Sequence, residues 1–581
     1  MADELNLGIV GSGGDGVMVC GEIIVSAAAR KGLDCLMLKS YGPQIRGGES
    51  SCKIRLSKDK ASAPPDKVDV LLAFNWKDYH RFGIELALSP EGVVVEEGEE
   101  GEPEPERSIV GPSPKVYYRL PLTRLSKSAT GSVLARNMVA LGALSQLFNL
   151  PDEELRKSIE KTFLRKGAEV VGNNLKAYLA GRDYASQSIT KGDSLRLSAG
   201  EKTGRRLVLT GNEAVAYGAL LAGCRFFSGY PITPSSEIME WLSVYLPAYG
   251  GTMVQTEDEM AALGMVLGAS LAGVKAMTAT SGPGLSLMTE MIGLASIAEI
   301  PSVIVDVQRV GPSTGIPTKS EQSDLMHAVF GGHGDAPRVV MAPADVADCF
   351  EVMSEAFHIS EKYQLPVIVL SDGFIGQCKA VVEEPDLTRF YHSEREHPDP
   401  SLASEYKRFE ITPSGVSPMS VPGVDKFIYR AAGIEHNEEG NPTSDFELHQ
   451  KMNEKRFRKL PYIAREFNFM SFFGNEKART GVIAWGSSRG AVAEAVETLN
   501  RDGHAVKAVF PRVLFPLDVE KLKKFFQGLE RLLVVELNYS AQFLNLLRTQ
   551  VDLPAGTVHY GRSGGKPLVA SEVIEEIRKL F

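Results

Sequence analysis

VKAMTATSGPGLSLMTE, residues 274–290, joins an apolar run, a Gly-Pro-Gly turn and a helical stretch. The run has the length of a buried strand, and PSVIVDVQ, at residues 301–308, is a second run of the same kind. Apolar strands that alternate with helices are typical of α/β domains with a mostly parallel sheet. These two strands therefore decide the fold class of the central part of the chain, and polar turns follow them directly.

The regions on either side repeat this alternation. Near the N-terminus we expect a strand at residues 5–10, the loop GSGGDG, a helix at 17–32 and further strands at 35–40 and 68–74. A mostly parallel sheet is expected here as well. The segment 476–581 alternates in the same way. The predicted fold class is α/β, with several three-layer α/β domains.

Changes in composition suggest where these domains begin and end. The predicted segments are an α/β domain at residues 1–192, a polar linker at 193–205, a second α/β domain at 206–380, an extended connector at 381–475 and a third α/β domain at 476–581. The connector is rich in Pro, Glu and His and has weak periodicity, which is unusual inside one compact domain and so separates two.

Two stretches of the first domain carry their own expectations. Residues 96–107, EEGEEGEPEPER, lack apolar side chains and contain two prolines. This composition predicts a solvated loop, with a docking site for a basic partner as the alternative. A helical stretch is expected around residues 137–155.

The bulk composition narrows the class of protein. The 581 residues are 43% hydrophobic, which is enough for real cores, and the formal net charge of -10 argues against nucleic acid or an anionic membrane as the main partner. No two of the six cysteines form a CxxC pair, which argues against a metal or iron–sulfur site in this chain. The start has no signal-peptide pattern, and the longest uncharged apolar stretch, residues 260–274, is too short to span a bilayer. We therefore expect a cytoplasmic enzyme or enzyme subunit.

GSGGDG, residues 11–16, fits the GxGxxG pattern of dinucleotide sites and lies between a predicted strand and a predicted helix. The acidic residue expected at the end of the second strand is missing, because that strand ends in Lys39 and Ser40. The alternative is a tight strand-to-helix turn, which could bind a phosphate of another ligand. The loop also contains GDG, the start of a thiamine-diphosphate magnesium motif. No Asn stands between Asn6 and Asn75, so we place no magnesium half-site here.

YPITPSS, residues 230–236, is a turn after a predicted strand. Its two prolines fix two backbone φ angles, so that the hydroxyl of Thr233 is held in one direction. Either Ser235 or Ser236 is also suited to cap the following helix, EIMEWL. Both interpretations can hold together.

TEDEMAALGMVLGASLAG, residues 256–273, begins with the three acids Glu257, Asp258 and Glu259. Acids at a helix N-terminus ordinarily complement the helix dipole at the surface, which accounts for Glu257 and Asp258. Glu259 lies one turn into a face of small and apolar residues, where its carboxylate would be desolvated. An acid in such a place is a candidate functional group.

Two further turns follow the central strands. In SGPGLSLMTE, Gly282 and Gly284 allow backbone amides to approach a ligand closely, with an ordinary turn and helix cap as the alternative. Arg309 directly follows the strand at residues 301–308. The carboxyl ends of strands in an α/β sheet face the usual ligand crevice, so Arg309 is a candidate ligand-binding residue, with a surface arginine as the alternative.

YPITPSS, TEDEMAALGMVLGAS, TSGPGLSLMTE and QRVGPSTGIPT, in this order and at this spacing, resemble the α subunit of 2-oxoacid:ferredoxin oxidoreductases. The first domain is similar to the family's γ subunit through GSGGDG and SYGPQIRGGESS, and the connector strings GIEHNEEGN and KRFRKL also match. The tail is similar to a transketolase C-terminal-type domain, although ELNYSAQ lacks the glycine of the usual ENNxxGQ. The resemblance covers nearly the whole chain, as a fused γ–α subunit.

This resemblance implies a γ-type domain, a pyrimidine-binding domain for thiamine pyrophosphate and a transketolase C-terminal-like domain. It implies a separate β subunit that carries the pyrophosphate-binding domain, Mg²⁺ and a [4Fe–4S] cluster, so that no metal ligand is expected in this chain. Coenzyme A is the implied second substrate and ferredoxin the implied electron acceptor. The implied reaction is the oxidative decarboxylation of a 2-oxoacid to an acyl-CoA, or the reverse carboxylation, in a dimer of γα–β heterodimers.

Residue roles also follow from the resemblance. Glu259 is the implied catalytic residue, which holds the proton on N1′ of the cofactor's pyrimidine. Pro231 and Ile232 are expected to line the pyrimidine pocket. Thr233 and Arg309 are expected to bind the carboxylate of the substrate.

The identity of the 2-oxoacid and the class of protein both have alternatives. We associate a γ–α fusion with enzymes for 2-oxoglutarate and with broad-specificity enzymes, so 2-oxoglutarate is expected and pyruvate is the alternative. A second carboxylate needs another cation, either Lys319 or a lysine of the β subunit. From other classes, a nicotinamide-dependent dehydrogenase would use GSGGDG, and a non-catalytic assembly subunit would keep only the fold. The missing acid counts against the first, and the presence of Glu259, Thr233 and Arg309 counts against the second.

Overall fold

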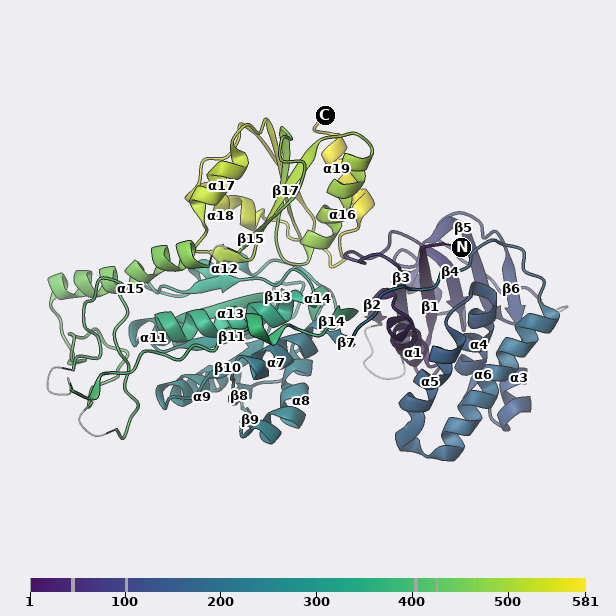
Figure 1. Ribbon diagram of the computed structural model, residues 1–581, viewed down its shortest axis with the longest axis horizontal. Coiled ribbons are helices and arrows are strands. Elements are labelled where there is room, and N and C mark those ends of the chain that lie inside the picture. Colours follow the sequence, from purple (N-terminus) through teal and green to yellow (C-terminus); the bar gives the residue numbers. More distant parts are fainter. Residues whose placement is uncertain (1, 43–47, 100–102, 402–405, 425–426, 468) are drawn as a thin grey trace. The chain divides into compact units, whose positions relative to one another are not determined.

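The computed structural model describes residues 2–42, 48–99, 103–401, 406–424, 427–467 and 469–581. The chain forms two compact units: residues 1–209 with 377–384, and residues 210–376 with 385–581 (Figure 1). In the described part of the chain, no helix is both long and apolar enough to cross a membrane.

The first unit is built on an eight-stranded sheet of order β6-β5-β4-β1-β3-β2-β14-β7. Its strands are β1 (Glu4–Ser12), β2 (Asp34–Tyr41), β3 (Glu49–Ser57), β4 (Val68–Ala73), β5 (Leu88–Glu97), β6 (Tyr117–Leu120), β7 (Arg206–Thr210) and β14 (Lys379–Glu383). The prediction of a mostly parallel sheet is wrong here. The unpredicted β3 pairs antiparallel with both β1 and β2, because the few residues after β2 are too short for a parallel crossover. Part of that connection, residues 43–47 of SYGPQIRGGESS, lies outside the described residues.

Helices cover one face of this sheet with a continuous apolar core. They are α1 (Val17–Arg30), α3 (Leu122–Thr130), α4 (Arg136–Phe148), α5 (Asp152–Phe163) and α6 (Ala168–Ser188). The helical stretch predicted at residues 137–155 is two helices, α4 and α5, because Asn149 turns left-handed with a φ of 58° and Pro151 follows it. The second core lies under the short helix α2 (Tyr79–Phe82).

The acidic segment at residues 96–107 is only partly the solvated loop that its composition predicts. Glu96 is buried at the end of β5, and its carboxylate accepts hydrogen bonds from Trp76 and from Arg107 (2.8 and 2.5 Å). Arg107, at the other end of the segment, therefore folds the loop back onto the sheet. Residues 100–102 lie outside the described residues.

The second unit contains a seven-stranded sheet of order β18-β12-β13-β11-β10-β8-β9, parallel except for β18. Its strands are β8 (Phe226–Gly229), β9 (Thr252–Gln255), β10 (Ala276–Thr280), β11 (Ser302–Gln308), β12 (Val339–Met341), β13 (Pro366–Asp372) and β18 (Val513–Phe515). The strands predicted at residues 274–280 and 301–308 are β10 and β11, and both are buried throughout.

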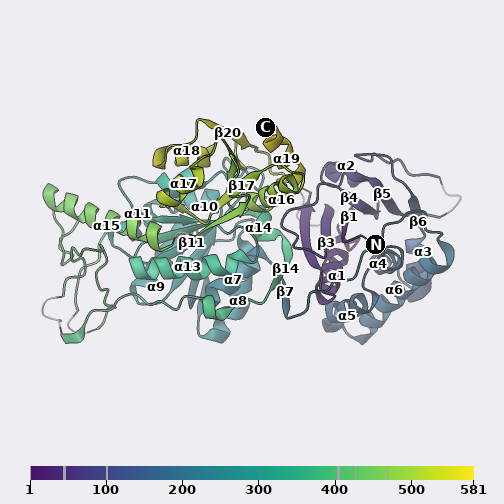
Figure 2. The ribbon, with the colours of Figure 1, turned by 45° about the horizontal axis from the view of Figure 1, so that its top comes forward.

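Helices pack against this sheet in two groups (Figures 1 and 2). α7 (Gly211–Leu221), α8 (Ser236–Tyr245) and α13 (Asp348–Tyr363) pack together, and α7 starts at a capping box between Thr210 and Glu213. α9 (Glu259–Leu271), α10 (Gly282–Leu287), α11 (Thr289–Ile297) and α12 (Leu325–Phe330) share one apolar core with the C-terminal part of the chain. The short α14 (Gly373–Gln377) follows β13.

The C-terminal part is a five-stranded sheet of order β15-β17-β16-β19-β20. Its elements are β15 (Met470–Gly474), β16 (Thr480–Ala484), α16 (Ser488–Arg501), β17 (Val506–Pro511), α17 (Val519–Phe526), β19 (Arg531–Glu536), α18 (Gln542–Gln550), β20 (Gly556–Gly561) and α19 (Ala570–Arg578). α16 and α19 lie on one side of the sheet and α17 and α18 on the other (Figure 1).

The predicted connector contains a long helix that the weak periodicity did not indicate, α15 (Phe446–Glu466). A buried ion network holds this helix: the carboxylate of Glu299 accepts hydrogen bonds from Lys455 at 2.6 and 2.8 Å and from Lys459 at 2.6 Å. Arg408 adds a third cation, which donates to the backbone carbonyl of Glu299 at 2.7 Å. Buried charges therefore anchor the connector to the rest of the second unit, together with the buried apolar residues Met452, Leu460 and Ile463. Its residues 402–405, 425–426 and 468 lie outside the described residues.

Candidate active site

The four motifs of the central domain meet at one edge of its sheet. They follow β8, β9, β10 and β11, which are parallel, so that their carboxyl ends share an edge. From β8 the chain continues to β9 on one side, whereas β10 lies on the other side of β8. This reversal of direction between β8 and β10 marks the crevice in which open α/β sheets bind ligands.

The turn after β8 carries Pro231, Ile232 and Thr233. Pro231 and Thr233 are exposed and Ile232 is half-buried, so all three remain accessible in this chain. The predicted cap is wrong: Ser235 makes no side-chain cap, and its hydroxyl donates instead to the carbonyl of Ile232 at 2.9 Å. The hydroxyl of Ser235 therefore stabilises the turn and does not cap the helix.

Arg309 lies beside this turn, as its place after β11 predicts. Its Nη1 donates to the backbone carbonyl of Thr233 at 2.7 Å, and the residue is only 7% exposed. Its Nε has no hydrogen-bond partner among the described residues. Arg309 is therefore not the surface arginine of the alternative interpretation, and the structure brings it together with Thr233.

The three acids before α9 occupy three different environments. Glu257 is exposed, and Asp258 caps the helix by accepting a hydrogen bond from the amide of Ala261 at 2.7 Å. Glu259, the first residue of α9, is 6% exposed. Its carboxylate accepts no hydrogen bond from any residue that the structure describes. A buried carboxylate without a donor is costly, so Glu259 is suited to meet a ligand.

The glycines after β10 are required by two acids that flank the turn. A Cβ at Gly284 would overlap the hydroxyl of Thr280 and lie 2.8 Å from Oε1 of Glu259. A Cβ at Gly282 would lie 2.8 Å from Oδ2 of Asp324. The turn thus passes between Glu259 and Asp324 at a distance that only glycine allows.

Asp306 and Asp324 are site residues that the sequence analysis missed. Asp306 is fully buried in β11, and Asp324 precedes α12, where its amide donates to Oε1 of Gln308 at 3.1 Å. An acid inside the apolar run PSVIVDVQ was the available signal, since a charge in a buried strand calls for a partner.

The tail motif ELNYSAQ positions the segment that contains Asp324. Asn538 donates to the carbonyl of Gln322 at 3.0 Å, and Gln542 donates to the carbonyl of Ser323 at 2.6 Å. Ala541 stands where the usual motif has glycine and adopts a φ of 53°. The departure from the motif therefore leaves the left-handed turn in place.

Lys319 lies near the site through the loop after β11. The amide of Val310, the residue after Arg309, donates to the carbonyl of Lys319 at 3.0 Å. The loop thus returns Lys319 to the neighbourhood of the arginine. No contact described for its side chain assigns it to a substrate.

The GSGGDG loop in the first unit uses its acid internally. Asp15 accepts hydrogen bonds from the amide of Ser12 (2.8 Å) and from Asn75 (3.2 Å), and it forms an ion pair with Arg136. Lys39, at the end of the second strand, pairs with Glu22 at 2.9 Å. A hollow of about 190 Å³ is lined by the loop and the start of α1.

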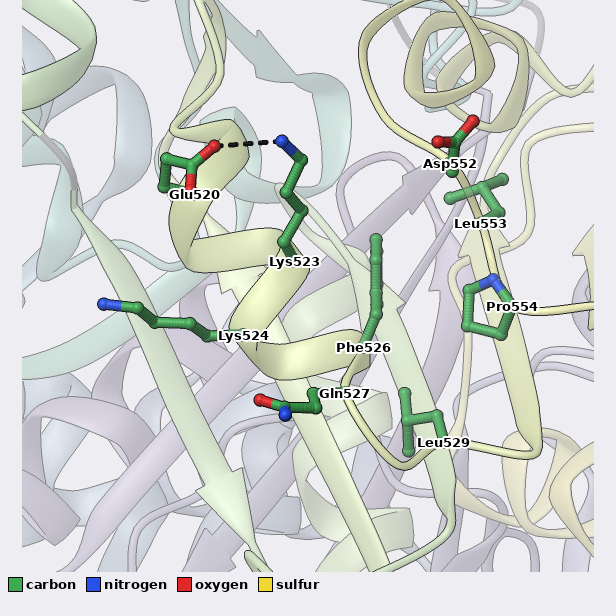
Figure 3. A pocket seen from close by; sticks show the side chains of 9 residues that line it. All are labelled: Glu520, Lys523, Lys524, Phe526, Gln527, Leu529, Asp552, Leu553 and Pro554. Carbon is green, nitrogen blue, oxygen red and sulfur yellow. Dashed lines mark hydrogen bonds and ion pairs between the residues drawn. The ribbon is translucent and has the colours of Figure 1, made fainter.

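A larger hollow of about 500 Å³ lies on the C-terminal sheet domain, between the region of α17 and the loop before β20 (Figure 3). Lys523, which lines it, is paired with Glu520 at 3.0 Å. None of the predicted site residues lines this hollow.

The fold and the edge site define an α/β protein with a candidate ligand site at the carboxyl edge of the parallel sheet in its second unit. Residues 217–455 match the family described as pyruvate flavodoxin/ferredoxin oxidoreductase, thiamine diP-bdg, and residues 6–184 match pyruvate ferredoxin/flavodoxin oxidoreductase. The chain is 30% identical to the 2-oxoacid:ferredoxin oxidoreductase subunit alpha of a Sulfolobus species, over 99% of this chain and 96% of that one. It is 39% identical to the 2-oxoglutarate synthase subunit KorA of Methanothermobacter marburgensis, over 58% of this chain and 90% of that one.

A solved structure extends the likeness to the whole chain. It is the 2-oxoglutarate:ferredoxin oxidoreductase of Magnetococcus marinus with 2-oxoglutarate, coenzyme A and succinyl-CoA bound. The TM-score is 0.94 at 37% identity, over 100% of both chains. The chain therefore belongs to the 2-oxoacid:ferredoxin oxidoreductase family, in which it is similar to the α subunits. It is an oxidoreductase subunit with a thiamine-diphosphate-binding domain.

Proposed function

We propose that this chain, with a separate β subunit, converts 2-oxoglutarate, coenzyme A and oxidised ferredoxin to succinyl-CoA, carbon dioxide and reduced ferredoxin, or catalyses the reverse carboxylation. The observation that carries the proposal is the carboxylate of Glu259, buried at the switch point of the sheet and without a donor in the described chain. It lies inside the segment that matches the thiamine-diphosphate-binding family.

The residues around Glu259 fit the pyrimidine end of thiamine pyrophosphate. The carboxylate needs a donor, which a protonated N1′ provides, and the missing side chain of Gly284 leaves room beside Oε1 of Glu259. Pro231 and Ile232, both accessible, would line the pocket. When bound, this cofactor supplies a carbanion and an electron sink for cleavage next to the keto group. Glu259 would act by holding the proton on N1′.

Arg309 and Thr233 are proposed to bind the carboxylate of the 2-oxoacid. The guanidinium already uses Nη1 on the carbonyl of Thr233, so it is fixed in place with Nε unpaired. A fixed guanidinium can bind a carboxylate through two parallel hydrogen bonds. The distal carboxylate of 2-oxoglutarate would need a second cation, from Lys319 or from a lysine of the β subunit.

A partner chain is proposed to complete the site with the pyrophosphate-binding domain, Mg²⁺ and the [4Fe–4S] cluster. The face of α9 directly after Glu259 supports this: Met260 and Met265 are 45% and 40% exposed, and Leu287 of α10 is 48% exposed. An uncharged helix face in water is unusual and is typical of a surface that another chain covers. We propose a dimer of γα–β heterodimers in the cytoplasm, with ferredoxin as the acceptor.

The substrate is proposed from the relatives. One is named 2-oxoglutarate synthase, and the solved structure holds 2-oxoglutarate and succinyl-CoA. Others, such as the Sulfolobus protein, are named for 2-oxoacids in general, which keeps a broad-specificity enzyme as the second candidate. The test is to purify the chain with its partner and compare kcat/KM for 2-oxoglutarate, pyruvate and 2-oxobutyrate. A preference for 2-oxoglutarate is expected, and equal values would support the broad-specificity enzyme instead.

A further inference from the structure

Asp306 and Asp324 are two buried acids that interact with each other and with Arg309. Asp306 lies two residues before the end of β11 and is 0% exposed. Asp324 approaches from the loop before α12, with its Oδ2 buried against the Gly282 turn. The two carboxyls are within hydrogen-bonding reach of each other, and burial together with Asp324 raises the pKa of Asp306. The nearby charge of Arg309 acts to lower the pKa of both acids.

These acids lack hydrogen-bond donors. Among the described residues, no donor reaches either carboxylate oxygen of Asp306 or Oδ2 of Asp324. Nε of Arg309 likewise has no acceptor there. The neighbouring strands do not supply one: the hydroxyl of Thr280, level with Asp306 on β10, donates to the carbonyl of Ser281 at 3.3 Å. On β13, Asp372 is another acid, which accepts from the amide of Ile375 at 3.0 Å.

The remaining titratable groups nearby do not neutralise the pair. Glu321 adds a negative charge near Asp324, although its Oε1 accepts a hydrogen bond from the amide of Gly564 at 2.7 Å. On α12, burial lowers the pKa of His327, so this ring stays neutral near pH 7. Among the residues that the structure describes, Arg309 is the cation that acts to lower the pKa of both acids, so its one positive charge faces two carboxyls.

Two buried carboxylates repel each other, and each also lacks a hydrogen-bond donor. One proton shared between them removes the repulsion and supplies a donor. The proton supplies the missing donor, and the pair then carries one negative charge against one on Arg309. In agreement with this, burial and the neighbouring Asp324 hold the pKa of Asp306 well above its usual range. Burial raises the pKa of Asp324 to about 6.

We propose that Asp306 and Asp324 share one proton and are positioning residues for Arg309, so that the charge of this pair sets how strongly Arg309 binds the carboxylate of a 2-oxoacid. The role of Arg309 in this statement rests on the proposed function, whereas the shared proton does not. The two parts can therefore fail separately.

The pair links substrate binding to protons. As the pH falls through about 6, the pair takes up its second proton and becomes neutral, which leaves the charge of Arg309 to the substrate. The KM for every 2-oxoacid should therefore fall below pH 6, by roughly tenfold if the coupling is of the usual size. Because coupling is reciprocal, binding of a 2-oxoacid should also take up protons near pH 6.

The shared proton can be measured without activity, by infrared difference spectroscopy of the purified complex at pH 7.5. The wild type should show the C=O band of a protonated carboxylic acid that Asp306→Asn lacks, because the amide replaces the proton and leaves Asp324 ionised. Other protonated acids cancel in the difference, including Glu355, whose pKa burial raises to about 8. Asp335→Asn, at an exposed position, is the control and should leave the band. If the wild-type band persists in Asp306→Asn, the proposal of a shared proton is wrong.

Steady-state kinetics with Asp324→Asn tests the second part. The wild-type KM for 2-oxoglutarate should change between pH 5.5 and 7.5, and this change should be absent in Asp324→Asn, while thermal unfolding checks that the variant is folded. A folded variant that keeps the pH-dependent KM contradicts the link to Arg309. If the complex oxidises no 2-oxoacid, the proposed function fails, and the infrared band still decides whether the proton is shared.

Discussion

Glu259 is the residue on which the proposed chemistry depends. Its two neighbours in TEDE have ordinary roles, since Glu257 is exposed and Asp258 caps α9. Glu259 alone is buried without a donor. A structural acid in this position would be expected to have a partner in its own chain.

Glu259→Gln should lower kcat of the reconstituted complex by about 10² to 10⁴, the usual range for a lost general acid–base group. The amide keeps the shape of the side chain but cannot hold the proton on N1′. Folding should survive, because the buried carboxylate lacks a stabilising partner. The measurement is steady-state reduction of a viologen dye. Glu257→Gln is the matched control, and the assignment of the catalytic acid is wrong if this exposed change costs more activity than Glu259→Gln.

Arg309→Lys should raise KM for every 2-oxoacid, because all of them share the C1 carboxylate. The loss of one charge-assisted hydrogen bond costs about 1.5–3 kcal/mol, or roughly tenfold to a hundredfold in kcat/KM. Thr233→Val should have a milder effect, because the carbonyl that accepts from Arg309 is kept. Kinetics with pyruvate and 2-oxoglutarate check this. An effect on 2-oxoglutarate alone would mean that Arg309 binds the distal carboxylate.

Sequence reasoning located these residues because each follows a strand, and parallel strands end at one edge. The sequence does not single out Asp306, because one acid inside a mostly apolar run still fits the pattern of a buried strand. Nor does it show the role of Asn538 and Gln542, whose contacts with residues 322–323 join segments more than 200 residues apart. Such long-range contacts leave no local pattern in the sequence.

At the scale of elements, the turn between β10 and α10 is the most constrained part of the site. A Cβ at either of its two glycines would lie too close to an acid, Glu259 in one case and Asp324 in the other. The sequence predicts a close approach at this turn, but it does not show which groups approach.

Gly284→Ala should destabilise the protein by about 1–3 kcal/mol and reduce activity, since the new methyl group overlaps Thr280 and displaces Glu259. Thermal unfolding and dye reduction are the measurements. Gly293→Ala is the control, because a Cβ there has open space within α11. If both changes behave alike, the turn is less tightly packed around Glu259 than the distances indicate.

The network that anchors α15 makes a pH-dependent contribution to stability. Burial lowers the pKa of Lys455 to about 7, although Glu299 opposes this. Burial alone would raise the pKa of Glu299, but Lys455 and Lys459 hold it well below its ordinary range. Lys455 therefore loses its proton near pH 7 in the folded chain, while the carboxylate of Glu299 stays charged.

Between pH 7 and 9 the unfolded chain holds the proton on Lys455 that the folded chain loses. Stability from this residue therefore rises with pH, by up to about 1.4 kcal/mol per pH unit. Buried cysteines such as Cys20 oppose the trend, because burial raises the pKa of its thiol to about 12. The test compares urea unfolding of wild type and Lys455→Met at both pH values. The variant should lose part of the wild-type gain between pH 7 and 9, and equal slopes for the two proteins would contradict the prediction.

Expectations about elements held where apolar runs were long. β10 and β11 were predicted as strands because each lies in a mostly apolar run, and both are buried throughout. The helix α15 was missed because charged residues interrupt the apolar pattern of its buried face, which mixes Met452, Leu460 and Ile463 with Lys455, Arg456 and Lys459. The mixed sheet of the first unit was missed because β3 has no strong apolar run.

For the whole molecule, the two compact units do not follow the predicted segment boundaries. β7, at residues 206–210, belongs to the first sheet although it lies in the predicted second domain, and so does β14, at residues 379–383, which spans the predicted boundary between the second domain and the connector. The local sequence pattern of a strand does not show whether it pairs within the sheet of its own domain or within another sheet. The predicted division into five segments therefore stays a prediction.

The measurement that tests the central claim most directly is electron transfer by the purified chain, alone and with its β subunit. With both chains, thiamine pyrophosphate, Mg²⁺, coenzyme A and 2-oxoglutarate, we expect reduction of a viologen dye that stops when any of these is omitted, and no reduction of NAD. The chain alone should be inactive, because the proposed function assigns the pyrophosphate-binding domain, Mg²⁺ and the cluster to the β subunit. Reduction of NAD, or full activity of the chain without a partner, would contradict the account.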